Sequence, residues 1–158
     1  MAISCNNFKA NLLIPALVEL HPVIPNESNA IKQLLGTFAV ESDFGTNWIQ
    51  LKNGPAKNPF GIERATFDDE MRYLKDRQPE LLHKIIESSN LLVGPNYEDL
   101  TFNIRLAIQF CRVKYFMVQE AIPSSLAAQA AYWKKYYNTT AGRGTVEDYI
   151  NKYHKYVE

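Results

Sequence analysis

Two glutamates stand where a protein could place proton-transfer chemistry. Leu34 and Phe38 repeat at helical spacing, and Glu41 is the next position on the same apolar face. A carboxylate is costly on the core side of a helix, and burial raises its pKa toward the range in which a general acid works near neutral pH. The spacing predicts that Glu41 is a proton donor, and the alternative is a surface glutamate at a fraying helix end.

Glu63 is the best candidate for a second carboxylate, because it follows a loop long enough to return across a groove. It would either take part in catalysis or form structural hydrogen bonds. Asp43 is nearer to Glu41 along the chain, but a short acidic side chain there can simply satisfy the helix end or its own turn.

The loop between the two glutamates has a composition that suits sugar binding. Trp48 offers a flat apolar face, Gln50 offers an amide, and Gly61 lets the backbone approach a ligand closely. Glycans present apolar ring faces with hydroxyl and acetamido groups, and they need no charged pocket. The plainer interpretation is an ordinary surface loop.

Several segments then resemble one enzyme superfamily. Residues 41–45, E-S-D-F-G, resemble the E-S-x-x-G segment of soluble lytic transglycosylases and goose-type lysozymes, and residues 59–66, P-F-G-I-E-R-A-T, are similar to their second conserved segment. A phage branch of this superfamily shares three further elements in the same order, which here are G-P-A at 54–56, Y-W-K-x-x-Y-N-T at 132–139 and G-x-G-T at 142–145.

The resemblance implies an all-α, lysozyme-like fold with a loop-lined cleft that cleaves the β-1,4 bond between N-acetylmuramic acid and N-acetylglucosamine in peptidoglycan. It makes Glu41 the proton donor, includes Ser42 in the substrate-binding segment, and places Tyr137 and Asn138 on the cleft wall. No cofactor or metal is implied. The expected partners are peptidoglycan glycan strands and other phage tail or virion proteins.

Two departures from the family pattern bear on activity. Gly61 stands where the family usually has Gln, and Arg64 stands where it has Pro. An alternative is therefore a structural tail or adaptor protein that keeps the scaffold with a degenerate, inactive site. If the site is active, hydrolysis and transglycosylation both remain open, since in the latter the sugar's own 6-hydroxyl attacks and leaves a 1,6-anhydro end.

The elements that must position these residues are nearly all helical. Periodicity and capping residues predict about seven helices, no strand pair, and a single domain over residues 1–158. The expected helices are residues 8–20 with a kink or break at Pro15, one capped by Asn26 or Ser28, one opening at Thr66, one starting at Pro79, one over 100–115, one from Ser124 or Ser125 to about Tyr137, and one capped by Thr145.

Composition excludes several other classes of protein. Among the 158 residues, Lys plus Arg and Asp plus Glu number 17 each, so no net positive charge attracts nucleic acid. The three histidines lack metal-ligand spacing, and the two cysteines are expected to be free thiols. The first residues lack a secretory signal and the run 12–18 is too short to span a bilayer, which predicts no membrane insertion and synthesis in the host cytoplasm. A virion would then carry the protein to the bacterial wall.

Overall fold

The computed structural model describes residues 3–25, 27–50 and 54–158. Throughout these ranges the fold is all-α, without a strand, as the sequence predicts. The helical elements in chain order are α1 (Cys5–Phe8), η1 (Lys9–Leu13), α2 (Ile14–Val18), α3 (Ser28–Ser42), α4 (Arg64–Arg77), α5 (Pro79–Ser88), α6 (Asp99–Phe102), α7 (Ile104–Phe116), α8 (Leu126–Trp133), η2 (Lys134–Asn138) and α9 (Val146–Tyr156).

The first helix runs without a break from α1 through η1 into α2, although Pro15 was expected to kink or split it. η1 is a π-helical turn, and Pro15 lies just after it, in the first turn of α2. A proline lacks the backbone N–H, and its ring crowds the carbonyl of the preceding turn. The wider π-helical turn accommodates this defect and keeps the helix continuous.

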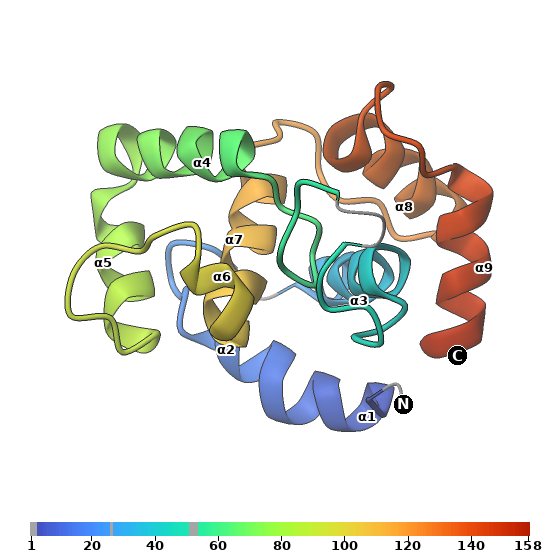
Figure 1. Ribbon diagram of the computed structural model, residues 1–158, viewed down its shortest axis with the longest axis horizontal. Helices are drawn as coiled ribbons and strands as arrows, with labels where there is room; N and C mark the ends of the chain where they lie inside the picture. Colours follow the sequence, from blue (N-terminus) through green and yellow to red (C-terminus); the bar gives the residue numbers. More distant parts are fainter. Residues whose placement is uncertain (1–2, 26, 51–53) are drawn as a thin grey trace.

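Helix α3 is the central element of the fold. It packs against α7, α8 and α9, and Figure 1 shows it almost end-on beside α9. Gly36 makes the contact with α9 possible, because a Cβ there would lie 2.0 Å from the hydroxyl oxygen of Tyr149. The amide of Gln33 donates to the same hydroxyl at 3.2 Å and to the hydroxyl of Tyr115 at 3.3 Å. The helix that carries Glu41 is therefore held by packing and by buried polar bonds.

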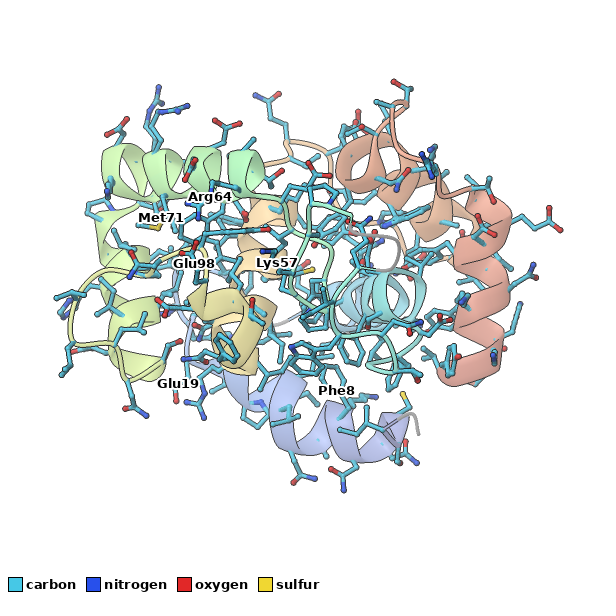
Figure 2. The ribbon with its side chains drawn as sticks, viewed as in Figure 1. Phe8, Glu19, Lys57, Arg64, Met71 and Glu98 are labelled. Atoms are coloured by element: carbon cyan, nitrogen blue, oxygen red, sulfur yellow. The ribbon has the colours of Figure 1, made fainter. Side chains whose placement is uncertain are left out.

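A cluster of aromatic rings fixes the end of α3 against the N-terminal helix. The Phe8 ring stacks on Phe38 at a centroid separation of 4.2 Å, and Phe44 meets Phe38 edge-on at 4.9 Å. Phe60, from the loop before α4, approaches Phe38 at 5.2 Å. Figure 2 shows Phe8 pointing from α1 toward the middle of the molecule. These contacts place the 54–63 segment beside the last turn of α3.

Helices α4 and α5 form one end of the molecule (Figure 1). Helix α4 begins at Arg64, two residues before the expected start at Thr66, and Glu63 is its N-cap residue. The Arg64 guanidinium pairs with Glu98, as Figure 2 shows, and lies over the Tyr97 ring at 4.8 Å. Arg64 therefore anchors the start of α4 to the loop before α6.

The expected number of helices is close to the observed one. The described residues form eight continuous helical stretches, because α1, η1 and α2 are one helix and α8 with η2 is another. The stretch that the sequence did not predict separately is the short α6, which precedes α7. Asn26, one of the two caps proposed for α3, lies outside the described residues, and Ser28 is the first residue of that helix. No helix in the described ranges is long and apolar enough to cross a membrane.

Candidate functional site

A cleft of about 930 Å³ opens between the end of α3, the 54–63 segment, the start of α4, the end of α7 and the turn after η2. Its size fits the range typical of ligand-binding pockets. The residues that line it are Val40, Glu41, Asp43, Asn47, Gln50, Gly54, Pro55, Gly61, Glu63, Thr66, Asp69, Glu70, Lys114, Met117, Trp133, Tyr136, Tyr137, Asn138, Thr139, Ala141, Gly142, Arg143 and Gly144. Six of the eight residues named from the sequence are among them, while Ser42 and Trp48 do not line the cleft; the six are Glu41, Gln50, Gly61, Glu63, Tyr137 and Asn138.

Glu41 lies in the last turn of α3, and its carboxyl group is a wall of the cleft. The indole N–H of Trp133 donates to Glu41 Oε1 at 3.1 Å. Burial raises the pKa of Glu41 from the ordinary 4.5 to about 7, while the Trp133 hydrogen bond and the charge of Lys114 lower it and the charge of Glu63 raises it. At neutral pH a substantial fraction of Glu41 is therefore protonated and able to donate a proton.

Gly61 lies directly against this carboxyl group. A Cβ at Gly61 would be 2.3 Å from Glu41 Oε2, and the residue has a φ of +66°. Both facts favour glycine, because a side chain would collide with Glu41 and a positive φ is strained for other residues. The glutamine expected here from the family pattern therefore has no room without a shift of the loop or of Glu41. Gly61 makes space for the acid instead of supplying an amide.

The chain leaves α3 abruptly just after Glu41. Asp43, Phe44 and Gly45 all have positive φ, at 50°, 53° and 81°. Left-handed backbone at non-glycine residues costs roughly 1–3 kcal/mol each and is found preferentially at functional sites. The turn is over-determined by its contacts, since Phe44 is fully buried and Asn47 donates to Asp43 Oδ2 at 2.7 Å. The carboxylate of Asp43 also pairs with Lys152 on α9.

Two predicted substrate-binding residues hold the loop and do not line the cleft. The Ser42 side chain is 1% exposed, donates to the carbonyl of Phe38 at 2.8 Å and accepts from the N–H of Gly45 at 2.9 Å. The indole N–H of Trp48 donates to the carbonyl of Thr101 at 2.6 Å. Both side chains therefore have structural partners, and their role in substrate binding stays a prediction that the geometry does not favour.

Gln50 and Glu63 do line the cleft. The side-chain oxygen of Gln50 accepts from the N–H of Ala56 at 3.1 Å, so this amide is partly committed to closing its own loop. Glu63 is exposed, and its side chain makes no capping bond to α4. Its carboxylate is thus available to the cleft, on the wall that also carries Gly61.

Tyr137 lines the cleft and holds the segment that precedes α4. Its hydroxyl donates to the carbonyl of Phe60 at 2.7 Å, and its side chain is 4% exposed. This bond ties η2 to the residue that precedes Gly61. Tyr137 therefore positions the segment against which Glu41 lies, and it lines the cleft.

Asn138 presents its amide in a defined orientation. Lys134 donates to Asn138 Oδ1 at 2.7 Å and to the carbonyl of Gly142 at 2.9 Å. The oxygen of the amide is thereby engaged by a cation, and its NH₂ group can donate to a ligand in the cleft that Asn138 lines. A Cβ at Gly142 would lie 2.4 Å from Asn138 Oδ1, so this turn also depends on a glycine. Asn138 is suited to donate a hydrogen bond to a ligand oxygen.

Several charged residues of the cleft were not predicted as site residues from the sequence, among them Glu70 on α4 and Lys114 on α7. A signal was present, because Glu70 falls on the same helical face as Phe67, Met71 and Leu74, as Glu41 does with Leu34 and Phe38. Glu70 is 1% exposed, and neither carboxyl oxygen has a hydrogen-bond partner among the described residues.

Acidic groups outnumber basic ones along the cleft. The acids are Glu41, Asp43, Glu63, Asp69 and Glu70, and the lysine and arginine side chains are Lys114 and Arg143. In the described part of the chain no group of three His, Cys, Asp or Glu residues is placed to hold a metal ion. The arrangement can protonate a bound ligand through Glu41 and stabilise positive charge through its other carboxylates.

Neither protein-family models, curated protein sequences nor solved structures match this chain.

Proposed function

We propose that this protein is a peptidoglycan-cleaving enzyme, a muramidase or lytic transglycosylase that acts on the β-1,4 bond between N-acetylmuramic acid and N-acetylglucosamine. Its place would be in a phage virion or tail, opening the bacterial wall locally during infection. The phage part of the proposal rests on the sequence resemblance in residues 54–56, 132–139 and 142–145. The chemical part has independent support in the cleft.

The observation that carries the proposal is the protonatable carboxyl of Glu41 on the cleft wall. Cleavage of a glycosidic bond requires an acid that gives a proton to the departing oxygen, and such an acid works best when its pKa lies near the working pH. Burial brings the pKa of Glu41 to about 7. The Trp133 N–H holds one oxygen of the carboxyl at 3.1 Å, which leaves the other to face Gly61 and the cleft.

Two further features of the cleft suit a glycan. The glycines and the amide of Asn138 let a ring hydroxyl or acetamido group approach the backbone closely. The exposed carboxylate of Glu63 would stabilise the positive charge that develops on the sugar ring as the bond breaks. Glu63 is the residue best placed to act as the second carboxylate, because it lines the cleft and has no capping bond.

Mass spectrometry of purified peptidoglycan incubated with the protein tests this proposal. Muropeptides with 1,6-anhydro ends identify a lytic transglycosylase, and muropeptides with reducing ends identify a hydrolase. If the folded protein releases no fragments from the walls of several bacteria, that result would contradict the proposed peptidoglycan-cleaving activity.

The alternative, a structural tail or adaptor protein on the same scaffold, has one observation in its favour. The substrate-binding glutamine of the related enzymes is missing, and the close approach of Glu41 to Gly61 leaves no space for it. On this alternative the parent protein would bind another virion protein and would not cut peptidoglycan. The same digestion experiment separates the two proposals.

A further inference from the structure

The cleft contains a partly buried cation whose role the proposed acid chemistry leaves open. Lys114 lies near the end of α7, and its ammonium donates to the carbonyl of Tyr137 at 2.9 Å and sits 3.9 Å above the centre of the Tyr137 ring. Neither partner carries a formal charge. The positive charge of Lys114 is therefore held in place at the cleft without being neutralised by the groups that hold it.

The carboxyl groups around Lys114 come from three other parts of the fold. Glu41 is at the end of α3, Glu63 precedes α4, and Glu70 projects from the buried face of α4. All three favour the charged form of Lys114, with Glu70 the strongest, against burial, which lowers the pKa of the amine. Among the described residues that line the cleft, the lysine and arginine side chains are those of Lys114 and the exposed Arg143. The positive charge of Lys114 interacts with all three carboxyl groups.

Glu70 is the least satisfied of these groups. It is 1% exposed, and both of its oxygens lack a hydrogen-bond partner among the described residues. Buried polar groups are almost always hydrogen-bonded, so an exception calls for an explanation. Burial raises the pKa of Glu70, and the charge of Lys114 is the largest influence that lowers it. Glu70 therefore depends electrostatically on Lys114.

We propose that Lys114 is a positioning residue of this site: its fixed ammonium stabilises the carboxylate that Glu41 becomes when it gives up its proton, and Glu70 is the buried acid that shares this charge. The electrostatic part holds whatever the protein's substrate is, whereas the catalytic part rests on the proposed function.

In the proposed reaction Glu41 transfers its proton to the glycosidic oxygen while the bond between that oxygen and the anomeric carbon breaks, and the bonding electrons leave with the oxygen. Glu41 is then an anion in a poorly solvated place. Without a nearby cation, burial would make Glu41 a weaker acid and its anion less stable. Lys114 offsets part of that penalty, and the Trp133 N–H offsets another part.

The other groups around Glu41 act in known directions. The charge of Glu63 raises the pKa of Glu41. The thiol of Cys111 and the hydroxyl of Tyr137 would act on Glu41 only in their ionised forms, and burial disfavours those forms. The carboxylate of Asp43 pairs with Lys152 and accepts a hydrogen bond from Asn47. Lys114 is therefore the cation whose removal should change the proton affinity of Glu41.

The test is an NMR titration of the Glu41 carboxyl carbon in the full-length protein, assigned with Glu41→Gln. Lys114→Met keeps the length of the side chain and removes the charge, and it should raise the titration midpoint of Glu41 by about one pH unit or more. Lys114→Arg keeps a positive charge and should leave the midpoint near that of the parent. Lys114→Met could also strand Glu70, so the double variant Lys114→Met/Glu70→Gln provides a second protein in which the midpoint should rise.

An unchanged midpoint in folded Lys114→Met, or in the double variant when the single one does not fold, would overturn the inference. Peptidoglycan cleavage provides a separate readout. Lys114→Met should lower kcat with little change in KM and should move the alkaline limb of the pH profile upward, and Lys114→Arg should restore both. A shifted midpoint in a protein that cuts nothing would leave the electrostatic role standing and reject the proposed function. Peptidoglycan cleavage by the parent, together with an unshifted Glu41 midpoint in Lys114→Met, would support the proposed function and reject the electrostatic role of Lys114.

Discussion

The carboxyl of Glu41 rests on the bare backbone of Gly61, so close that a Cβ at Gly61 would lie 2.3 Å from Glu41 Oε2. The last turn of α3 and the loop before α4 are thus in contact at Glu41, the candidate acid. The bond from the Tyr137 hydroxyl to the Phe60 carbonyl at 2.7 Å holds the loop in this position from the other side.

Gly61→Ala should damage both the fold and the site. The methyl group would collide with Glu41, and the backbone φ of +66° is unfavourable for alanine. We expect a loss of about 1–3 kcal/mol in the free energy of unfolding, measured by urea denaturation, together with a loss of activity. Gly94→Ala is the matched control, because nothing lies within 4 Å of a Cβ at that position. Equal effects of the two substitutions would contradict the close approach of Glu41 to Gly61.

Glu41→Gln should stabilise the protein in alkaline solution. In the folded protein Glu41 keeps its proton until about pH 7, whereas in the unfolded chain it loses the proton near 4.5. Between these values the unfolded chain binds fewer protons, so the contribution of Glu41 to stability falls as the pH rises toward 7 and stays low above it.

Glutamine does not titrate and avoids this loss. At pH 8 the variant should therefore gain up to about 3 kcal/mol over the parent, relative to the difference between the two proteins at pH 4.5. Urea denaturation of both proteins at the two pH values measures this. A difference that does not change with pH would show that the pKa of Glu41 is not raised.

Tyr137→Phe tests the bond that positions the loop. The substitution keeps the ring under Lys114 but leaves the buried carbonyl of Phe60 without its donor, which should cost about 1–3 kcal/mol in the free energy of unfolding. Tyr73→Phe is a suitable control, because Tyr73 is only partly buried and packs at the edge of the core. A Tyr137→Phe protein as stable as the control would show that the hydroxyl does not tie η2 to the loop.

Asn138→Ala and Trp48→Phe should separate the cleft from its supporting loop. Asn138 lines the cleft, whereas the Trp48 indole donates to the carbonyl of Thr101. With N-acetylglucosamine oligomers as the probe and Glu41→Gln as the non-cutting background, Asn138→Ala should weaken binding roughly 2- to 13-fold. Trp48→Phe should leave binding unchanged and lower the melting temperature. Weaker binding in Trp48→Phe alone would return Trp48 to the substrate-binding residues.

Helix periodicity predicted the helices and placed Glu41 on an apolar face, and the same reasoning extends to another residue of the cleft. Continuing the spacing of Leu34 and Phe38 identified Glu41. The same reasoning on Phe67 and Leu74 identifies Glu70, a charged residue on an apolar stripe. No recognisable motif accompanies Glu70 on that helix, so spacing is the one signal that points to it.

The loop contacts were not predictable in this way. The flat apolar ring of Trp48 predicts a surface on which a sugar could stack. Its indole N–H instead donates a hydrogen bond to the carbonyl of Thr101, far along the chain. Gly61 has no room for a side chain because the Glu41 carboxyl lies against it. The position of that carboxyl in space cannot be read from a local sequence pattern. Contacts between segments distant in sequence decide both cases, and propensity and spacing describe only neighbours.

The most direct test of the proposed function compares the parent and Glu41→Gln on the same purified peptidoglycan at pH 6, with released muropeptides counted by mass spectrometry. The amide keeps the shape of the side chain and can still accept from the Trp133 N–H, but it has no proton to give. We expect the parent to release muropeptides and the variant, shown to be folded by circular dichroism, to be slower by about 100- to 10,000-fold. A folded Glu41→Gln protein that releases muropeptides as fast as the parent would contradict the assignment of Glu41 as the proton donor.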